Sequence, residues 1–185
     1  LPFIGDPNPD FVMNYTNTFE YKGLSLGFQI NHTSGGDIYS TTTATLMGRG
    51  LTTDTQDRLS TYILPGININ TGLPNDIQIN NSTFYFDNGF ASPADELSVY
   101  DGSVVRLREV NVAYSLPSKL LDKTPFGKVT IKASAFNMWY NAYNTPDGVN
   151  FDPNTTGLGA GNGQGFEFLT GPSSKRYGMS VNLSF

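Results

Sequence analysis

The chain has 185 residues and a formal net charge of −5, with 15% charged and 38% hydrophobic residues, both below the values usual for soluble globular proteins. The acidic balance argues against a nucleic-acid partner, and the absence of cysteine excludes a disulfide scaffold and a thiolate metal site. No run of about 18 apolar residues is present, so no membrane-spanning helix is expected, whereas the strands of a membrane barrel would leave only a weak hydropathy signal.

Two strand regions are predicted in the first quarter of the chain, at about 17–32 and 37–47. Residues 24–31 alternate strictly between apolar side chains and polar or small ones. This pattern predicts a strand, because successive residues of a strand point to opposite faces of a sheet. Gly35 and Gly36 predict a short turn between the two regions, since paired glycines permit the positive φ of a tight turn. The second region is rich in threonine, but its alternation is less regular.

A long polar stretch separates these regions from two further predicted strands. It covers about residues 48–102, and loops of this length are usually functional. The next strands are predicted at about 103–116 and 129–140, with a compact connection between them. In the first of these strands the apolar residues change register, which predicts a one-residue bulge near Arg108 and Glu109.

The last predicted strand, at about 174–185, follows a second long loop at about 141–172. Its apolar side chains stand at every second position and share one face: Tyr177, Met179, Val181, Leu183 and Phe185. In a soluble domain, a terminal strand with an exposed apolar face would invite aggregation. In a closed membrane barrel the same strand pairs with the first strand, which removes that problem.

Short and long connections alternate along the chain, as they do in a transmembrane β-barrel with tight periplasmic turns and long external loops. The pattern therefore predicts an all-β, antiparallel transmembrane barrel segment. The turns near Gly35 and Leu121 are expected on the periplasmic side, and the loops 48–102 and 141–172 outside the cell. About five strands cannot close a barrel, since the smallest barrels use about eight, so we expect the chain to be part of a larger one.

Five stretches resemble the end of a TonB-dependent outer-membrane transporter of the SusC/RagA type. They are Ile4–Phe11, Tyr21–Leu26, Val105–Val110 with Tyr114–Pro117, Phe136–Trp139 and Gly171–Ser174. The resemblance covers nearly the whole chain except the middle of the two long loops. No stretch of residues 1–185 resembles the family's plug domain or TonB box, so we do not expect these residues alone to form a working transporter. Met138 stands where the family often has leucine between asparagine and tryptophan.

The resemblance implies that residues 1–185 are the carboxy-terminal part of a 22-stranded barrel in the bacterial outer membrane. It implies a TonB-driven importer whose cargo is oligosaccharides or peptides, with a SusD-like surface lipoprotein as a lid over the external mouth. It also implies that the terminal alternation, with Phe185 and Tyr177, is the signal read by the outer-membrane assembly machinery. The family is not enzymatic, and no cofactor is expected.

The alternation predicts which side chains meet lipid. Six apolar residues are expected to face the acyl chains: Leu26, Phe28, Ile30, Met179, Val181 and Leu183. Four polar residues of the same strands are expected to face the lumen or the plug: Gln29, Asn31, Ser180 and Asn182.

Two groups of residues are candidates for contact with cargo or lid. Trp139, Tyr140 and Tyr143 could stack on sugar rings or touch the lid, although an aromatic girdle at the membrane interface is the more common arrangement. Arg106 shares a face with Arg108 that should point into the lumen, because an arginine at the bilayer midplane costs about 2–4 kcal/mol. A lumenal arginine could guide anionic cargo or pair with Glu109 or the plug.

Other patterns favour no site. Residues 147–157 are rich in oxygen ligands, and Asp152, Asn154 and Thr156 before Gly157 resemble the start of a calcium loop. Its twelfth position would be Gly163 instead of glutamate, so a turn-forming cluster is favoured. His32 is the single histidine, which argues against a metal or catalytic role. A secreted, carbohydrate-binding β-sandwich remains the alternative. A surface glycoside hydrolase would need convergent acid and base residues, which the sequence does not show.

Overall fold

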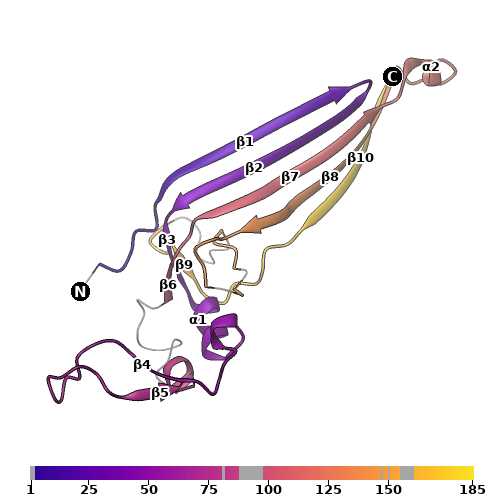
Figure 1. Ribbon diagram of the computed structural model, residues 1–185. Coiled ribbons are helices and arrows are strands. Elements are labelled where there is room, and N and C mark those ends of the chain that lie inside the picture. Colours follow the sequence, from indigo (N-terminus) through magenta and orange to yellow (C-terminus); the bar gives the residue numbers. More distant parts are fainter. Residues whose placement is uncertain (1–2, 81, 88–97, 147, 150, 155–160) are drawn as a thin grey trace.

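The computed structural model describes residues 3–80, 82–87, 98–146, 148–149, 151–154 and 161–185. Five long strands form one antiparallel sheet in the order β1-β2-β7-β8-β10. Their bounds are β1 Pro9–Tyr21, β2 Leu24–Gly35, β7 Val104–Ser115, β8 Lys128–Asn141 and β10 Arg176–Ser184. Figure 1 shows them side by side, with a lobe of short elements at one end.

The connections divide the sheet into two ends. At the turn end, Lys22 and Gly23 join β1 to β2 with φ of 48° and 85°, the positive values that a two-residue hairpin requires. The helix α2, Ser118–Leu121, and the carboxy terminus lie at this same end (Figure 1). The other end, here called the loop end, carries the segments 36–103 and 142–175.

The structure corrects the prediction for the first quarter of the chain. The region 17–32 belongs to two strands, because Gly23 completes a turn. The turn expected at 32–36 is instead the end of β2, so Gly35 lies at the loop end and not beside Leu121. Gly35 and Gly36 have φ of 73° and 84° where the chain leaves the sheet.

The region expected as a strand at 37–47 holds the short strand β3, Asp37–Ser40, followed by the helix α1, Thr41–Gly48. Ser40 caps the helix, since its Oγ accepts a hydrogen bond from the backbone N–H of Thr43 at 3.1 Å. The run of threonines favours a strand by intrinsic propensity. The Ser40 cap and the hydrogen bond from the N–H of Thr42 to Glu167 instead stabilise the first turn of a helix.

The register gives the sheet two chemically different faces. One cross-strand row, on the apolar face, is Phe19, Leu26, Val112, Ala133 and Met179. The neighbouring row, on the polar face, is Glu20, Ser25, Ala113, Lys132 and Ser180. The pairing of β7 shifts between Leu107 and Glu109, which confirms the predicted bulge at Arg108 and keeps the apolar residues of β7 on one face.

The lobe at the loop end gives the two long segments short elements of their own. In it β3 lies between β6, Val99–Asp101, and β9, Phe166–Glu167. The hairpin of β4, Thr61–Ile63, and β5, Gln78–Asn80, is flanked by two short helices, the 3-10 helix η1, Thr53–Thr55, and the π-helix η2, Ser82–Asp87. A small buried core of Ile38, Val149 and Phe151 packs against Leu46. Among the helices in the described residues, none is long and apolar enough to cross a membrane.

Candidate functional site

The polar face opens into a cavity of about 390 Å³ at the loop end of the sheet. Asn14 of β1, Asn31 and Thr33 of β2 and Arg108 of β7 form the sheet side of this cavity. Asn154 and Gln164, from the segment 142–175, form its opposite side. The strands fix the first group by their register, and the loop lobe brings the second group over them.

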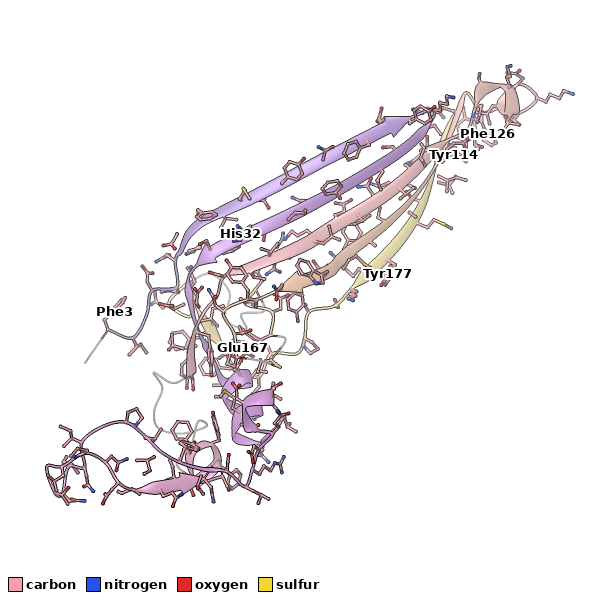
Figure 2. All side chains as sticks on the ribbon, viewed as in Figure 1. Phe3, His32, Tyr114, Phe126, Glu167 and Tyr177 are labelled. Carbon is pink, nitrogen blue, oxygen red and sulfur yellow. The ribbon has the colours of Figure 1, made fainter. Side chains whose placement is uncertain are left out.

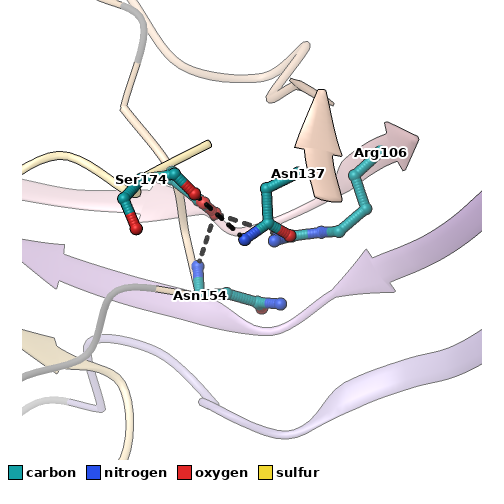
Figure 3. Close-up of polar contacts among 5 residues, drawn as sticks. Arg106, Asn137, Asn154 and Ser174 are labelled. Atoms are coloured by element: carbon teal, nitrogen blue, oxygen red, sulfur yellow. Dashed lines mark hydrogen bonds and ion pairs between the residues drawn. The ribbon is translucent and has the colours of Figure 1, made fainter. Parts of the chain in front are cut away.

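A buried ion pair fixes the loop segment to the sheet beside this cavity. The Arg106 guanidinium lies 3.0 Å from Oδ1 of Asp152, and their side chains are only 6% and 5% exposed. The backbone N–H of Asn154 donates to the same carboxylate oxygen at 3.1 Å. With its amide oxygen turned toward the guanidinium, Asn154 also accepts from both terminal nitrogens of Arg106 at 3.1 Å. Figure 3 shows Arg106 and Asn154 approaching from β7 and from the loop segment.

This geometry corrects the expectation for Arg106. Its partner is Asp152 instead of Glu109, whose carboxylate lies 3.9 Å from Lys132 on the neighbouring strand. The N–H of Asn154 closes a two-residue turn on Asp152, which agrees with the turn-forming cluster favoured over a calcium loop. In the described part of the chain, no group of three His, Asp or Glu side chains is placed to hold a metal ion.

The three aromatic residues expected to cluster are divided between the two faces. Trp139 pairs with Leu107 on the apolar face and is 53% exposed, whereas Tyr140 pairs with Arg106 on the polar face. Tyr143 lies beyond the strand, where its hydroxyl is 3.0 Å from Nε2 of His32. Adjacent residues of a strand point to opposite sides, so the single stacking surface considered for these residues is not formed.

His32 itself lies on the apolar side of the loop end, next to Phe11 and Tyr143. Its ring meets Phe11 edge-on with centroids 5.4 Å apart, and Tyr143 at 6.2 Å. Trp139 lies on the same apolar face, opposite Leu107.

A buried carboxylate that sequence reasoning missed holds the loop lobe together. Glu167 of β9 is fully buried, and its oxygens accept hydrogen bonds from Ser40, from Thr42 and from Thr170. Burial raises the pKa of Glu167, but the bonds from Thr42 and Thr170 lower it, and the net shift is downward. The ionised form is therefore favoured in the folded lobe. The hydrogen bonds to ionised Glu167 therefore stabilise the lobe fully above the pKa that Glu167 has in the unfolded chain. This stabilisation is lost as the pH falls through the lower pKa of Glu167 in the folded chain. Figure 2 shows Glu167 between the sheet and α1.

Asp101 links a second pair of segments in the lobe. It accepts from the backbone N–H and the hydroxyl of Ser103, and from the side-chain amide of Asn144 at 2.6 Å. Burial raises the pKa of Asp101, and the bonds from Ser103 and Asn144 lower it, again with a net downward shift. Each carboxylate joins a nearby partner to a distant one, Asn144 for Asp101 and Thr42 for Glu167, and sequence reasoning offers no signal for the distant partners.

The residues expected to meet lipid all lie on the apolar face. Met179, Val181 and Leu183 are 79%, 54% and 47% exposed, and Leu26 is 40% exposed. Phe28 is partly covered by aromatic neighbours on the same face, with ring centroids of Tyr15 and Phe19 at 6.0 and 6.3 Å. Ile30 is half-buried and pairs with Tyr15 and Leu107. Contact of these residues with acyl chains remains a prediction.

Phe185 lies at the turn end, and its side chain is 89% exposed. Its ring contacts Phe126 at 5.3 Å, and the preceding carbonyl of Ser184 accepts from the N–H of Gly127. Tyr177 is 71% exposed on the apolar face of the same strand.

We predict that Phe185→Asp lowers the amount of folded full-length protein in the membrane several-fold, because it removes the terminal aromatic of the alternating strand. Immunoblotting of membrane fractions, with unheated and heated samples compared on a gel, measures the folded fraction. Phe126→Asp is the matched control, since it removes the same ring contact but leaves the terminal residue intact. Normal membrane levels of Phe185→Asp would contradict a role as insertion signal.

No protein-family model matches the chain. Two curated proteins of Formosa agariphila do: TonB-dependent receptor P3, 27% identical over 98% of the chain, and TonB-dependent receptor P26, 25% identical over 98%. The chain spans only 17% and 18% of the length of these two relatives.

Solved structures agree in fold. The chain resembles the RagAB peptide importer in its closed-closed state with a TM-score of 0.60 at 18% identity, over 96% of the chain and 17% of that protein. A second structure, of the RagAB peptide transporter, gives a TM-score of 0.57 at 16% identity with the same coverage. The comparisons therefore confirm the resemblance seen in the sequence: over nearly its whole length, the chain is similar to a barrel segment of SusC/RagA-type TonB-dependent transporters.

Proposed function

We propose that this chain forms part of the wall of a TonB-dependent importer in the bacterial outer membrane. In this arrangement the apolar face meets lipid, the polar face lines the lumen around the plug, the turn end is periplasmic, and the loop end is external. A SusD-like lipoprotein would cover the loop end, and oligosaccharides or peptides would enter beneath it. The relatives are named as receptors and importers, which supports transport instead of catalysis.

The observation that carries this proposal is the separation of the apolar face from the buried core. The core lies in the loop lobe, around Ile38 and Phe151, while Met179 and Val181 of the sheet are exposed. A β-sandwich would instead bury the apolar faces of its sheets against each other. In addition, β1 and β10 each have one edge that pairs with no described strand, as expected where neighbouring strands of a larger barrel continue the sheet.

Uptake by the full-length protein tests the proposal. Cells that carry the transporter and its lipoprotein should fractionate it with outer membranes, and uptake of its cargo should stop when TonB is deleted. A protein that fractionates as soluble, or uptake that is independent of TonB, would contradict the proposal.

The hairpin of β4 and β5 is the part of the loop lobe best suited to meet the lid. Its backbone is ordered by its own hydrogen bonds, among them Asn75 N–H to Gly66 O at 2.9 Å and Asn68 N–H to Leu73 O at 2.8 Å. Yet several aliphatic side chains of this segment point outward: Leu59 at 93% exposed, Ile67 at 74%, Ile69 at 94% and Leu73 at 64%. Exposed apolar groups on an ordered external loop mark an interaction surface.

We predict that replacing residues 59–80 with a short Gly-Ser linker leaves barrel assembly intact, because loops tolerate deletion. Association with the lid should weaken by about tenfold or more, since buried apolar anchors dominate interface energies. Co-purification of the lid with the transporter, at several lid concentrations, measures this loss. Leu120→Ser, at an equally exposed apolar position of the turn end, is the control and should leave lid binding unchanged. Normal lid affinity in the deletion variant would show that this hairpin is not part of the interface.

A further inference from the structure

Two arginines that are two residues apart on β7 have different surroundings. Arg106 is buried, and its charge is compensated by Asp152 at 3.0 Å. Arg108 is exposed and lines the 390 Å³ cavity, and the described residues offer its side chain neither an ion pair nor a hydrogen bond. Of these two arginines, Arg108 therefore presents an available positive charge to the cavity, and Arg106 does not.

The bulge explains why the neighbouring glutamate does not neutralise Arg108. Arg108 is the extra residue of β7 relative to β2, so Arg108 and Glu109 follow each other where the register shifts. The Glu109 carboxylate lies 3.9 Å from the ammonium group of Lys132, and it also accepts from the amide of Asn111 at 3.2 Å. Glu109 is thus directed along the sheet toward β8, and Arg108 toward the cavity.

The rest of the cavity wall is uncharged and combines polar groups with apolar side chains such as Val12, Ile38 and Pro153. The amides of Asn14, Asn31, Asn154 and Gln164 contribute to it, and none of its lining residues is acidic. Asn31 is only 4% exposed and donates from its side-chain amide to Asn14 at 3.0 Å, so this part of the wall is held in place. A single guanidinium among ordered amides suits a ligand with one carboxylate and several hydroxyl or peptide groups, because a guanidinium binds a carboxylate through two parallel hydrogen bonds.

We propose that Arg108 is an anion-binding residue of the cargo chamber, and that the imported cargo carries a carboxylate group recognised there. The carboxylate could belong to an acidic sugar of an oligosaccharide or to an acidic residue of a peptide. The proposal rests on the proposed importer function, because it assumes that the polar face lines the path of the cargo.

The test uses the full-length transporter purified with its lid lipoprotein, with binding measured by titration calorimetry. Two pairs of probes distinguish the sources of the carboxylate: trigalacturonate against its methyl ester, and an aspartate-containing pentapeptide against its asparagine counterpart. The wild-type complex should bind the charged member of one pair at least about tenfold more tightly than the neutral member. Arg108→Gln should abolish this preference while leaving the affinity for the neutral member unchanged, and Arg108→Lys should retain part of it.

Arg49→Gln is the matched control, since Arg49 is exposed in the loop lobe and lines a different cavity. It should behave as the wild type. The proposal would be overturned if the wild type showed no preference for the charged probes, or if Arg108→Gln kept the wild-type preference. It would also be overturned if Arg108→Gln lost affinity for charged and neutral probes equally, because Arg108 would then serve the packing of the wall or plug. TonB-dependent uptake that persists with any of these results would leave the importer function standing and refute only the role of Arg108.

Discussion

Asp152→Asn should destabilise the full-length transporter by about 3–5 kcal/mol, because removing one member of a buried ion pair leaves the other charge uncompensated. The Arg106 side chain is buried, so water cannot replace the lost carboxylate. Its Nε is buried and has no hydrogen-bond partner in the described part of the chain, so the guanidinium depends on contacts through its terminal nitrogens. The measurement is the urea concentration at which the folded band disappears from an unheated gel.

Two further variants decide whether the effect belongs to the ion pair. Asp122→Asn removes an exposed carboxylate at the turn end and should change stability by less than about 0.5 kcal/mol. The double variant Arg106→Met with Asp152→Leu should recover most of the loss, since apolar residues of similar volume often replace a buried ion pair without cost. If Asp152→Asn unfolded at the wild-type urea concentration, the ion pair would not anchor the loop segment.

The period-two alternation of apolar residues predicted most strands of the sheet, but not the hairpin formed by β1 and β2. Phe11, Met13, Tyr15, Phe19 and Tyr21 stand at odd positions, so β1 carries the same period-two signal as β10. The region 17–32 was expected to be one strand, whereas the pair Lys22–Gly23 closes a hairpin within it. Once the turn is placed there, Tyr21 faces Leu24 and Phe19 faces Leu26, and the apolar residues before and after the turn share one face.

The loop lobe could not be predicted, because its elements depend on contacts between distant residues. The helix α1 begins in a threonine run that favours strands. Its first turn is held by Glu167, which accepts from the N–H of Thr42 at 3.0 Å across 125 positions of sequence. The partner of Arg106 lies 46 positions away in an irregular segment. Local patterns carry no information on such pairs.

The division of the aromatic residues, in contrast, could have been predicted. Trp139 and Tyr140 are neighbours in a strand, so alternation alone places them on opposite faces. Closeness in the sequence therefore does not place Trp139 and Tyr140 on one surface. Tyr140 is the member of that group on the polar face, where it lines a cavity of about 190 Å³ beside Asp152 and Phe151.

The two faces of β10 give the most direct test of the membrane assignment. Val181 lies opposite Ile131 on the apolar face, and Asn182 lies opposite Thr130 on the polar face. The two residues are adjacent, so they lie at nearly the same depth and differ mainly in the side to which they point. Asn182 is a better control than Ser180, because Ser180 lies opposite Lys132, where an added positive charge would be repelled.

Val181→Arg should cost about 2–4 kcal/mol of folding free energy if Val181 lies near the bilayer midplane, because the guanidinium must enter hydrocarbon. Asn182→Arg should cost less than about 1 kcal/mol, since its side chain meets a polar lumen or plug. Urea titration of the full-length protein refolded into lipid vesicles measures both values at the same depth of the barrel. Equal costs for the two variants would mean that both faces meet similar surroundings. A larger cost for Asn182→Arg would place the core on the polar side, and either result would contradict the assignment of the apolar face to lipid.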